Sequence, residues 1–517
     1  MMLRCRLVLI TGLLSGSACT TMDATTPAEP SGESSAEPSA DPSVEALVAT
    51  DPTLDDRIAA CSVDPRVVVG VATIDTCVGA DLFFRGQFGG NGRTCATCHR
   101  VDVNLTINPR FIATLPATDP LFVAEFNPNL KDLEKPPQMH QFGLILENVD
   151  GFAPDPRTNF VLRSVPHTLS MSTSVTRPPG SPNPPADRTG WSGDGAPNAG
   201  ALRDFMTGAI RQHYTKTLAR VPGQDFIFAS NAELGPIDDF MRRIGRSNEL
   251  ALNTVVMSDT RADAGRASFL AVGCNGCHGN AGANAGGSNA NFNTGVESSR
   301  NPALAAFPHD GGFGTIGGSV TGPFGDGTFN TPPLVEAADT GPFFHTATSI
   351  VGAPAHNTAT ASTIEEAIAF YTTPAFANAP NGFPIALNAT QIDNVGRFLR
   401  GVNATFSAAI ALKRIDAELA VVAQFHNTQL VIQRELIRLA NVEVGDAITV
   451  LSAVPNLDVA SQTSLNNAAT QLTTAQTTTV EATRVAALNA ARQLVTQGSS
   501  AIGTNLTYNI GEGSVMF

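Results

Sequence analysis

CATCH at residues 95–99 and CNGCH at residues 274–278 repeat one pattern, C-x-x-C-H, in a chain of 517 residues with only 8 cysteines. This pattern is the attachment motif of c-type haem. The two thiols add to the porphyrin vinyl groups, and the adjacent histidine reaches the iron as its near-side ligand. The sequence therefore predicts two covalent haem c groups, held by Cys95, Cys98 and His99, and by Cys274, Cys277 and His278.

Two other uses of paired cysteines fit this chain less well. A redox-active C-x-x-C would not need the histidine, and neither motif lies in a thioredoxin-like βαβ pattern. A zinc site usually pairs C-x-x-C units about 15–20 residues apart, whereas 179 residues separate Cys95 from Cys274. Covalent haem at both motifs is the leading interpretation.

The composition limits the partners of the chain. Its formal net charge is −14, which does not attract nucleic acid or an anionic membrane surface. A basic soluble protein, such as a small electron carrier, is compatible with this charge. The length predicts two to four domains, and 46 glycines with 34 prolines predict many loops.

The N-terminus has the layout of a secretory signal, at residues 1–19. Two arginines precede an apolar run at residues 7–14, too short to span a bilayer, and small residues lead to Cys19. This resembles a bacterial lipoprotein signal, in which Cys19 is lipidated; cleavage near Ala18 is the alternative. Residues 20–50 are of low complexity and predict a disordered linker. We expect a protein of the periplasm or cell envelope, with membrane contact only through a lipid anchor.

Two cysteines lie outside the signal and the haem motifs. Cys61 and Cys77 are close in sequence, in a chain that we expect to be exported to a compartment where disulfides form. A disulfide between them is the leading prediction, and two buried free thiols are the alternative.

Further short motifs occur in order along the chain: GADLFF (79–84), RSVP (163–166), GWSGDG (190–195), GRASF (265–269), TPPL (331–334), TGPFFH (340–345), TIEEAI (363–368) and NATQIDNVGRFLRG (388–401). With the two C-x-x-C-H motifs they resemble the bacterial di-haem cytochrome c peroxidase family, which includes the MauG-like enzymes, over roughly residues 60–405. The resemblance implies a mainly α fold. It consists of two c-type cytochrome haem domains with long loops, at residues 51–260 and 261–405, and a helical extension at residues 406–517.

Apolar residues at helical spacing predict where the helices lie. Within the part that resembles the family they cover residues 201–218, 236–244, 261–270, 363–370 and 390–402. Beyond it, residues 405–440 and 461–497 contain few Gly or Pro and keep the same spacing. We expect two or three helices there, in a hairpin that docks on the haem-binding part or on a partner. The boundary between the haem domains is expected near residues 257–262.

The resemblance also implies an activity. In this family the first haem is reactive and the second relays electrons to it. Hydrogen peroxide would be reduced with electrons from a small cytochrome or cupredoxin, and a homodimer is compatible with the family. Trp191 is the single tryptophan and falls on the position between the two haems, where an indole can carry an electron. A tryptophan that only fills the core is the alternative.

The first haem departs from the peroxidase pattern on its far side. Family peroxidases often hold a histidine a few residues before the motif that is RSVP here, and this chain has none there. An open, five-coordinate iron is therefore expected, as in the MauG-like enzymes. His140 and His167 are alternative ligands, although each is better explained as a surface or structural histidine.

The distal pocket of the first haem departs as well. Peroxidases of the family place a Gln and a Glu there to move a proton between the peroxide oxygens. Phe205 stands at the Gln position, and Gln212 and His213 are the nearest polar substitutes. A distal phenylalanine resembles the rubber oxygenases and suits dioxygen. The alternative is that Phe205 belongs to the core of its helix.

The second haem has a different far-side ligand from that of the family peroxidases. Tyr371 stands where they have a methionine, as in the MauG-like branch, and tyrosine is a known axial ligand that stabilises ferric iron. A buried tyrosine without an iron bond is the alternative, and His345 and His356 are rival ligands. The family's calcium ion implies a site at Thr340 and Pro342, although a serine replaces the asparagine of the usual motif.

An exported di-haem oxidoreductase of the cytochrome c peroxidase type is the leading hypothesis. MauG-like or rubber-oxygenase-like oxidation of another substrate is the alternative among enzymes. A non-enzymatic electron-transfer cytochrome is the alternative outside them. Such a carrier needs a firm far-side ligand on the first haem, which the sequence does not offer.

Overall fold

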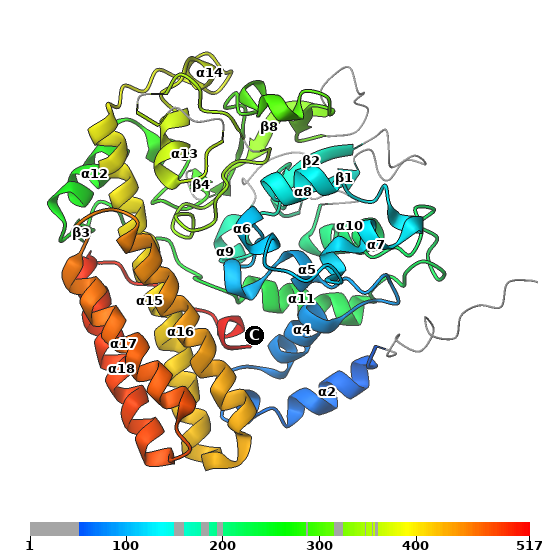
Figure 1. The fold of residues 1–517 in the computed structure, drawn as a ribbon, viewed down its shortest axis with the longest axis vertical. Helices are drawn as coiled ribbons and strands as arrows, with labels where there is room; N and C mark the ends of the chain where they lie inside the picture. Colours follow the sequence, from blue (N-terminus) through cyan, green and yellow to red (C-terminus); the bar gives the residue numbers. More distant parts are fainter. Residues whose placement is uncertain are drawn as a thin grey trace, which may run out of the picture. The chain divides into compact units, whose positions relative to one another are not determined.

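Helices make up most of the regular structure in the computed structural model, and the strands are few and short (Figure 1). The predicted mainly α class is confirmed. Among the described residues, no helix is both long and apolar enough to cross a membrane. The structure describes residues 51–148, 160–176, 186–193, 200–285, 288–314, 324–346, 348–353, 355–356 and 360–516.

The helices differ widely in length. The longer ones are α2 (Leu54–Ser62), α4 (Ile74–Arg85), α10 (Leu202–His213), α11 (Asn231–Arg242), α12 (Thr260–Ala271), α15 (Ala389–Phe425), α16 (Leu430–Ser452), α17 (Val459–Thr477) and α18 (Glu481–Ile502). The shorter ones are α3 (Pro65–Val68), α5 (Cys95–Cys98), α6 (Pro109–Ile112), α7 (Val123–Phe126), α8 (Pro136–Phe142), α9 (Met171–Ser174), α13 (Ile364–Phe370) and α14 (Pro374–Ala377). Single 3-10 turns are η1 (Val101–Val103), η2 (Pro120–Phe122), η3 (Pro128–Leu130), η4 (Cys274–Gly276), η5 (Glu297–Ser299), η6 (Pro302–Leu304), η7 (His426–Gln429) and η8 (Glu512–Val515).

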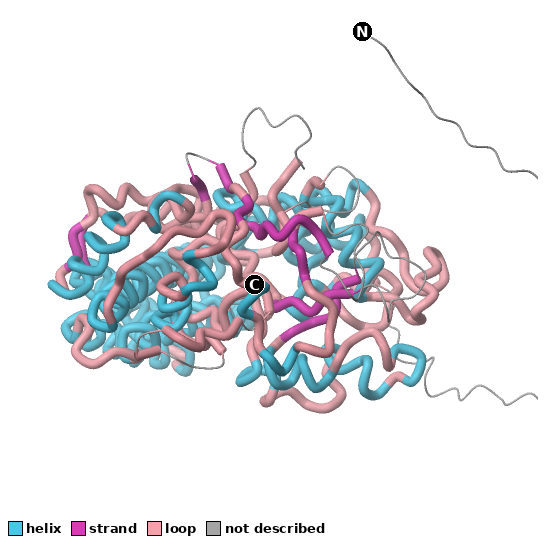
Figure 2. Tube along the Cα trace, turned by 90° about the horizontal axis from the view of Figure 1, so that it is seen from above, coloured by secondary structure: helices cyan, strands magenta, loops and turns pink. Residues whose placement is uncertain are grey.

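The strands form small separate sheets. Three are antiparallel pairs: β1 (Leu144–Asn148) with β2 (Phe160–Ser164), β3 (Val256–Met257) with β9 (Gly503–Thr504), and β4 (Asn284–Ala285) with β5 (Ser288–Asn289). The fourth has the order β6 (Asn291–Phe292), β8 (Phe324–Asn330), β7 (Asp310–Gly312). Loops and the strands other than β3 and β9 fill the side of the molecule away from the long C-terminal helices (Figure 2), whereas β9 follows α18 directly and pairs with β3.

Each C-x-x-C-H motif follows a helix that approaches a second helix closely. A Cβ at Gly79 of α4 would lie 1.9 Å from the carbonyl oxygen of Pro236 in α11. A Cβ at Gly265 of α12 would lie 1.8 Å from the carbonyl oxygen of Asn394 in α15. Only glycine allows backbones to come so near. In both halves of the chain, therefore, a glycine at a close contact between two helices positions the helix that precedes the motif.

Two predicted helix boundaries in the N-terminal half were wrong, and the helix expected at residues 390–402 continues to Phe425 as α15. α11 begins at Asn231 rather than at residue 236, because Ser230 and Glu233 form a capping box, a start signal that is present in the sequence. α10 ends at His213 rather than at residue 218. Beyond it the chain turns into a loop that Asp225 stabilises by accepting a bond from the amide of Val221 at 2.8 Å.

The C-terminal helices form a four-helix bundle. α15 and α17 each pack against both α16 and α18 (Figure 1). The two or three helices expected after residue 405 are present as α16, α17 and α18. The domain boundary expected between residues 405 and 406 lies inside α15, which has no proline and continues to Phe425. The same helix thus supports the second C-x-x-C-H motif, through its contact with α12, and belongs to the bundle.

The last described residues return from the bundle to the N-terminal half, beside α4 (Figure 1). The amide of Gly245 donates to Oγ of Ser514 at 2.9 Å, and the hydroxyl of Thr76 donates to Glu512 at 2.7 Å. The guanidinium of Arg414, in α15, donates to the carbonyl oxygen of Ser514 at 2.8 Å. The C-terminal segment therefore ties the bundle to α4 and α11, a connection that the sequence did not predict.

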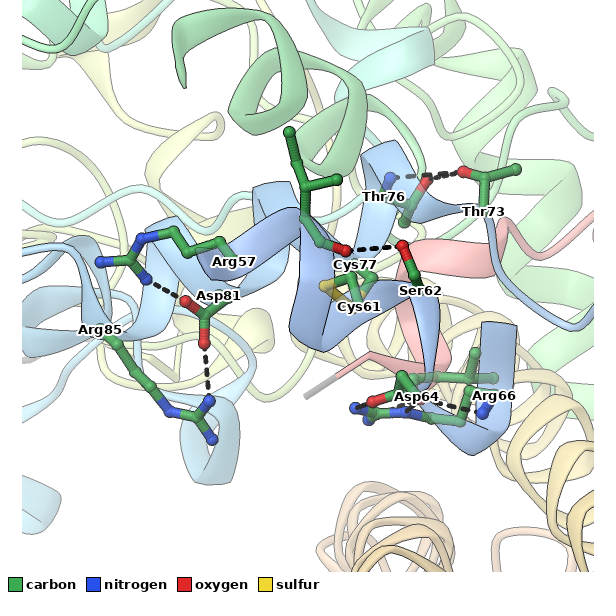
Figure 3. The surroundings of a disulfide bond; sticks show 12 residues. Arg57, Cys61, Ser62, Asp64, Arg66, Thr73, Thr76, Cys77, Asp81 and Arg85 are labelled. Atoms are coloured by element: carbon green, nitrogen blue, oxygen red, sulfur yellow. Dashed lines mark hydrogen bonds and ion pairs between the residues drawn. A yellow bond between two sulfur atoms is a disulfide. The ribbon is translucent and has the colours of Figure 1, made fainter. Parts of the chain in front are cut away.

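The predicted disulfide between Cys61 of α2 and Cys77 of α4 is present (Figure 3). It fastens the first described helix to the helix that leads to the first motif. Asp81 strengthens this attachment because it pairs with Arg57 of α2 and with Arg85, the latter at 2.6 Å.

A carboxyl group lies inside the bundle. Glu418 of α15 is 0% exposed, and neither of its oxygens has a hydrogen-bond partner among the described residues. Burial raises its pKa from 4.5 to about 8, although the nearby Arg484 guanidinium opposes the shift. The folded protein therefore holds a proton on Glu418 at pH values where the unfolded chain has released it.

We expect this proton to make stability depend on pH. The folded-state pKa is raised, so the free energy of unfolding falls as pH increases from about 4.5 towards about 8. The slope is about 1.4 kcal/mol per pH unit within this window. Glu418→Gln removes this contribution, and urea unfolding at pH 5 and pH 8 measures it. Glu435→Gln, at a half-exposed carboxylate of α16, is the control; equal pH dependence in wild type and Glu418→Gln contradicts the prediction.

Candidate functional site

One cavity, of about 760 Å³, is lined by both C-x-x-C-H motifs. Residues 179 positions apart in the sequence thus line the same cavity. The residues of the two motifs that line it are Cys95, Cys98, His99, Cys274, Cys277 and His278. A volume of this size is in the range of cofactor-binding pockets, which are roughly 300–1,000 Å³.

The imidazole of His99 is held in one orientation by a backbone carbonyl. Its Nδ1 lies 2.9 Å from the carbonyl oxygen of Leu105. Asn104 and Leu105 both adopt left-handed backbone, with φ of 58° and 55°, which turns the chain back towards the ring. Nδ1 carries the proton in this bond, so Nε2 keeps its lone pair. Burial lowers the pKa of His99 to about 4, and the ring is therefore neutral at pH 7.

His278 repeats this arrangement at the second motif. Its Nδ1 lies 3.0 Å from the carbonyl oxygen of Pro332, which belongs to the TPPL motif. Burial lowers its pKa to about 4 as well. Histidines that bind metal through Nε2 usually donate their other N–H to a carbonyl or carboxylate in this way. Both motifs therefore present a neutral imidazole whose Nδ1 is bonded to a backbone carbonyl.

The four thiols beside these imidazoles are free and uncharged. Burial raises the pKa of Cys95, Cys98 and Cys274 to about 11. The hydroxyl of Tyr214 donates to the sulfur of Cys95 at 3.2 Å. Two free thiols and one oriented imidazole are the donor set that a covalently attached haem requires, and each motif offers this set to the cavity. The residues present fit the group that the sequence implies.

Trp191 lines the cavity between residues of both halves. Its indole N–H donates to the carbonyl oxygen of Ser164 at 2.8 Å, and its own carbonyl accepts from the amide of Asn330 at 2.9 Å. Its ring centre is 6.2 Å from that of His345. The orientation of the indole is thus fixed by backbone contacts on both sides.

The three residues predicted for the distal pocket, Phe205, Gln212 and His213, all line this cavity. The Phe205 ring packs beside Gly190, where a Cβ would come within 2.9 Å of it. The side-chain amide of Gln212 lies 3.1 Å from Nε2 of His213 and accepts from the amide of Asn148 at 2.6 Å. Burial keeps the pKa of His213 well below its ordinary value, so its ring is neutral.

A carboxylate in the cavity was missed by sequence reasoning. Glu147, at the end of β1, lines the cavity and accepts from Arg163 of β2 at 2.7 Å. Arg163 also lines the cavity and pairs with Asp310 at 2.6 Å. Arg163 was recognised in the RSVP motif, but the pairing of β1 with β2 that brings Glu147 beside it depends on a contact between distant segments.

Tyr371 lines the same cavity near the second motif. Burial raises its pKa above the ordinary value, and the neighbouring thiols of Cys274 and Cys277 add to the shift. The phenol ring packs edge-on against Phe370 and Phe376, with centres 5.4 and 4.9 Å apart. Its position agrees with a far-side ligand and with a buried structural tyrosine, the two alternatives raised by the sequence.

The four histidines considered as alternative iron ligands lie in different places. His140 is half-exposed, pairs with Glu125 at 2.9 Å, and does not line the cavity. His356 likewise lies outside the cavity wall and pairs with Asp393 at 3.1 Å. His167 and His345 do line it. Nδ1 of His167 is buried and has no hydrogen-bond partner among the described residues.

The predicted calcium ligands and the predicted lipidation site remain. Thr340 and Pro342 line the cavity. Within the described residues no group of three or more His, Cys, Asp or Glu side chains forms a metal site, a finding that does not address backbone ligands. Cys19, the signal and the linker up to residue 50 lie outside the described residues. The site of calcium and the lipid anchor stay predictions.

Comparison with known proteins adds no relative: no family model matches the chain, and no curated protein matches it. The resemblance to di-haem peroxidases therefore depends on the motifs and on their arrangement around the cavity.

Proposed function

We propose that this chain is an exported di-haem c-type oxidoreductase that reduces hydrogen peroxide with electrons from a small donor protein. The single observation that carries the proposal is the shared cavity: two C-x-x-C-H motifs line it, each with two free thiols and an imidazole whose Nδ1 is bonded to a backbone carbonyl. A thiol redox pair would not need the two imidazoles. A structural zinc site needs four ligands around one ion, and the described residues hold no group of three or more His, Cys, Asp or Glu side chains that could bind one.

Each motif would hold one haem. Cys95 and Cys98 would bind the first through thioether bonds and His99 would bind its iron; Cys274, Cys277 and His278 would do so for the second. Bound haem supplies one-electron chemistry at iron, which the side chains of this protein do not provide. Tyr371 is the proposed far-side ligand of the second iron. In this reading residues 51–260 and 261–405 are the two haem domains.

The protein's own residues orient and connect these groups. Trp191, fixed by its bonds to Ser164 and Asn330, would pass electrons across the space between the motifs. Gln212 and His213 would transfer protons, because both line the cavity and their side chains lie within hydrogen-bond distance of each other. The acidic net charge of −14 favours a basic electron donor, a cytochrome or cupredoxin.

Steady-state turnover tests the proposal. The mature full-length chain, with covalent haem counted by intact mass, is mixed with hydrogen peroxide and a reduced small c-type cytochrome. We expect two haems per chain and oxidation of the donor that depends on peroxide. The control is the same assay without peroxide. A chain with two haems and no turnover contradicts the peroxidase proposal, and a chain without haem contradicts the whole assignment.

Phe205 favours a second candidate within the enzymes. An aromatic ring at this cavity position supplies no proton and no hydrogen bond to peroxide, which suits dioxygen chemistry. Under this candidate the chain oxidises an organic substrate, in the manner of the MauG-like enzymes or rubber oxygenases that it resembles. Consumption of dioxygen with negligible peroxide turnover would favour it. Ferric spectra without a high-spin signal would instead favour a simple electron carrier.

A further inference from the structure

His345 connects the cavity wall to a chain of polar groups. Its side chain is 1% exposed and lines the cavity, and its ring stacks on Phe329 with centres 3.9 Å apart. Ser164 holds the backbone at this point, because its amide donates to the carbonyl oxygen of His345 at 2.7 Å. The same Ser164 accepts the indole N–H of Trp191. Ser164 thus bonds both to the indole of Trp191 and to the backbone of His345.

Glu297 links His345 to a histidine at the surface. One carboxylate oxygen lies 3.0 Å from Nε2 of His345, and the other lies 2.9 Å from Nδ1 of His309. The Glu297 side chain is 15% exposed, whereas that of His309 is 51% exposed. Two hydrogen-bond steps therefore lead from solvent to the wall of the cavity, through three groups that can each gain and lose a proton.

The other charged and polar groups around Glu297 hold it in place. Arg300 approaches it at 3.4 Å and is itself fixed by the carbonyl oxygens of Phe307 and Pro308. The amide of Asp310 donates to the oxygen that faces His309, at 3.1 Å. Asp310 directs its own carboxylate to Arg163. The carboxylate of Glu297 is thereby aimed at the two imidazoles.

We propose that His309, Glu297 and His345 form the proton path that serves redox chemistry in the cavity. This inference rests on the proposed function, since reducing one peroxide to two waters consumes two electrons and two protons. The donor protein supplies the electrons and bulk water supplies the protons. A buried reaction that takes up charge needs such a supply, and histidine is suited to transfer protons near neutral pH.

Each transfer is balanced. In the state that transfers, Glu297 is protonated and donates to Nε2 of His345, and each imidazole carries its proton on Nδ1. His345 releases its Nδ1 proton towards the cavity and takes the Glu297 proton at Nε2, Glu297 takes the Nδ1 proton of His309, and water gives a proton to Nε2 of His309. One proton enters and one leaves, so the three groups keep their starting charges, and the two imidazoles then exchange protons to recover their Nδ1–H tautomers. His345 and Glu297 are positioning and relay residues; they are not iron ligands in this proposal.

The test uses the full haem-loaded chain and a pH-indicator dye in weak buffer. Proton uptake is followed after chemical reduction without peroxide, and again during peroxide turnover. Glu297→Gln keeps the shape of the side chain but removes the relay, so both uptake rates should fall by about 10²-fold. The matched control is Glu125→Gln, which removes the same carboxylate from the His140 pair outside the cavity and should leave both rates unchanged.

His309→Ala separates a relay from a structural role. Because His309 is half-exposed, added imidazole can take its place, so uptake should fall about 10-fold and recover with imidazole. A merely structural ion pair would show no such recovery. Unchanged uptake in Glu297→Gln, or a His309→Ala defect that imidazole does not repair, overturns the path. A wild-type chain that lacks haem or turnover fails the proposed function instead, and the two failures are distinguished by measuring wild type first.

Discussion

Replacing Cys274 and Cys277 together by alanine should lower the covalent haem content of the mature chain from two to one and abolish peroxide turnover with a reduced donor. The double variant keeps His278 and the first motif intact, but it removes the two thiols through which the second haem would be attached. Without the second haem, no cofactor on that side of the cavity could pass electrons to Trp191. We expect loss of turnover to the detection limit.

Intact mass and haem-stained denaturing gels measure the attachment directly. The control is the double variant Cys61→Ala with Cys77→Ala, which removes the disulfide and leaves all four motif thiols in place, so it should retain two haems. Replacing Cys95 and Cys98 should also leave one haem, now at the second motif. If the Cys274 and Cys277 variant still carries two covalent haems, the assignment of this motif is wrong.

Arg246→Met should destabilise the protein by about 3–5 kcal/mol, because it leaves a buried carboxylate without its counter-charge. Arg246 is 0% exposed and donates to Glu336, which is also 0% exposed, at 2.7 Å. It donates as well to Glu249 at 2.8 Å and to the carbonyl oxygen of Asn248 at 2.7 Å. These bonds join the segment after α11 to the segment that follows the TPPL motif.

A double-mutant cycle in urea isolates the charge effect. Arg246→Met combined with Glu336→Met removes both charges, so the double variant should lose clearly less stability than Arg246→Met alone. The exposed pair of Arg492 and Asp416 supplies the reference: Arg492→Met should change the free energy of unfolding by less than about 1 kcal/mol. A loss in Arg246→Met as small as that in Arg492→Met would contradict the prediction.

Local signals predicted the elements near each motif well. The helix expected at residues 363–370 corresponds to α13, and the one expected at residues 261–270 to α12, because capping residues and short-range apolar spacing mark both. The disulfide was predictable from the spacing and number of the cysteines. The capping box of Ser230 and Glu233 marks the start of α11 five residues before the predicted start at Pro236.

Contacts between distant segments were not predictable in the same way. Glu147 reaches the cavity because β1 pairs with β2, which follows it in the sequence after residues 149–159. Glu297 contacts His345, which is 48 positions further along the chain. The return of the C-terminal segment to α4 spans 436 positions, from Thr76 to Glu512. No periodicity in the sequence encodes such pairings. They depend on which surfaces become buried when the complete chain folds.

The amino-acid sequence alone determined the two C-x-x-C-H motifs, the residue types that each offers and the helical class, since these follow from spacing over one or two helical turns. Only the tertiary structure decided that both motifs line one cavity, that carbonyl oxygens of Leu105 and Pro332 orient the two imidazoles through Nδ1, and that the bundle is tied back to the N-terminal half. The reason is physical: local preferences act within a few residues, whereas the burial of a shared interior is a property of the complete fold.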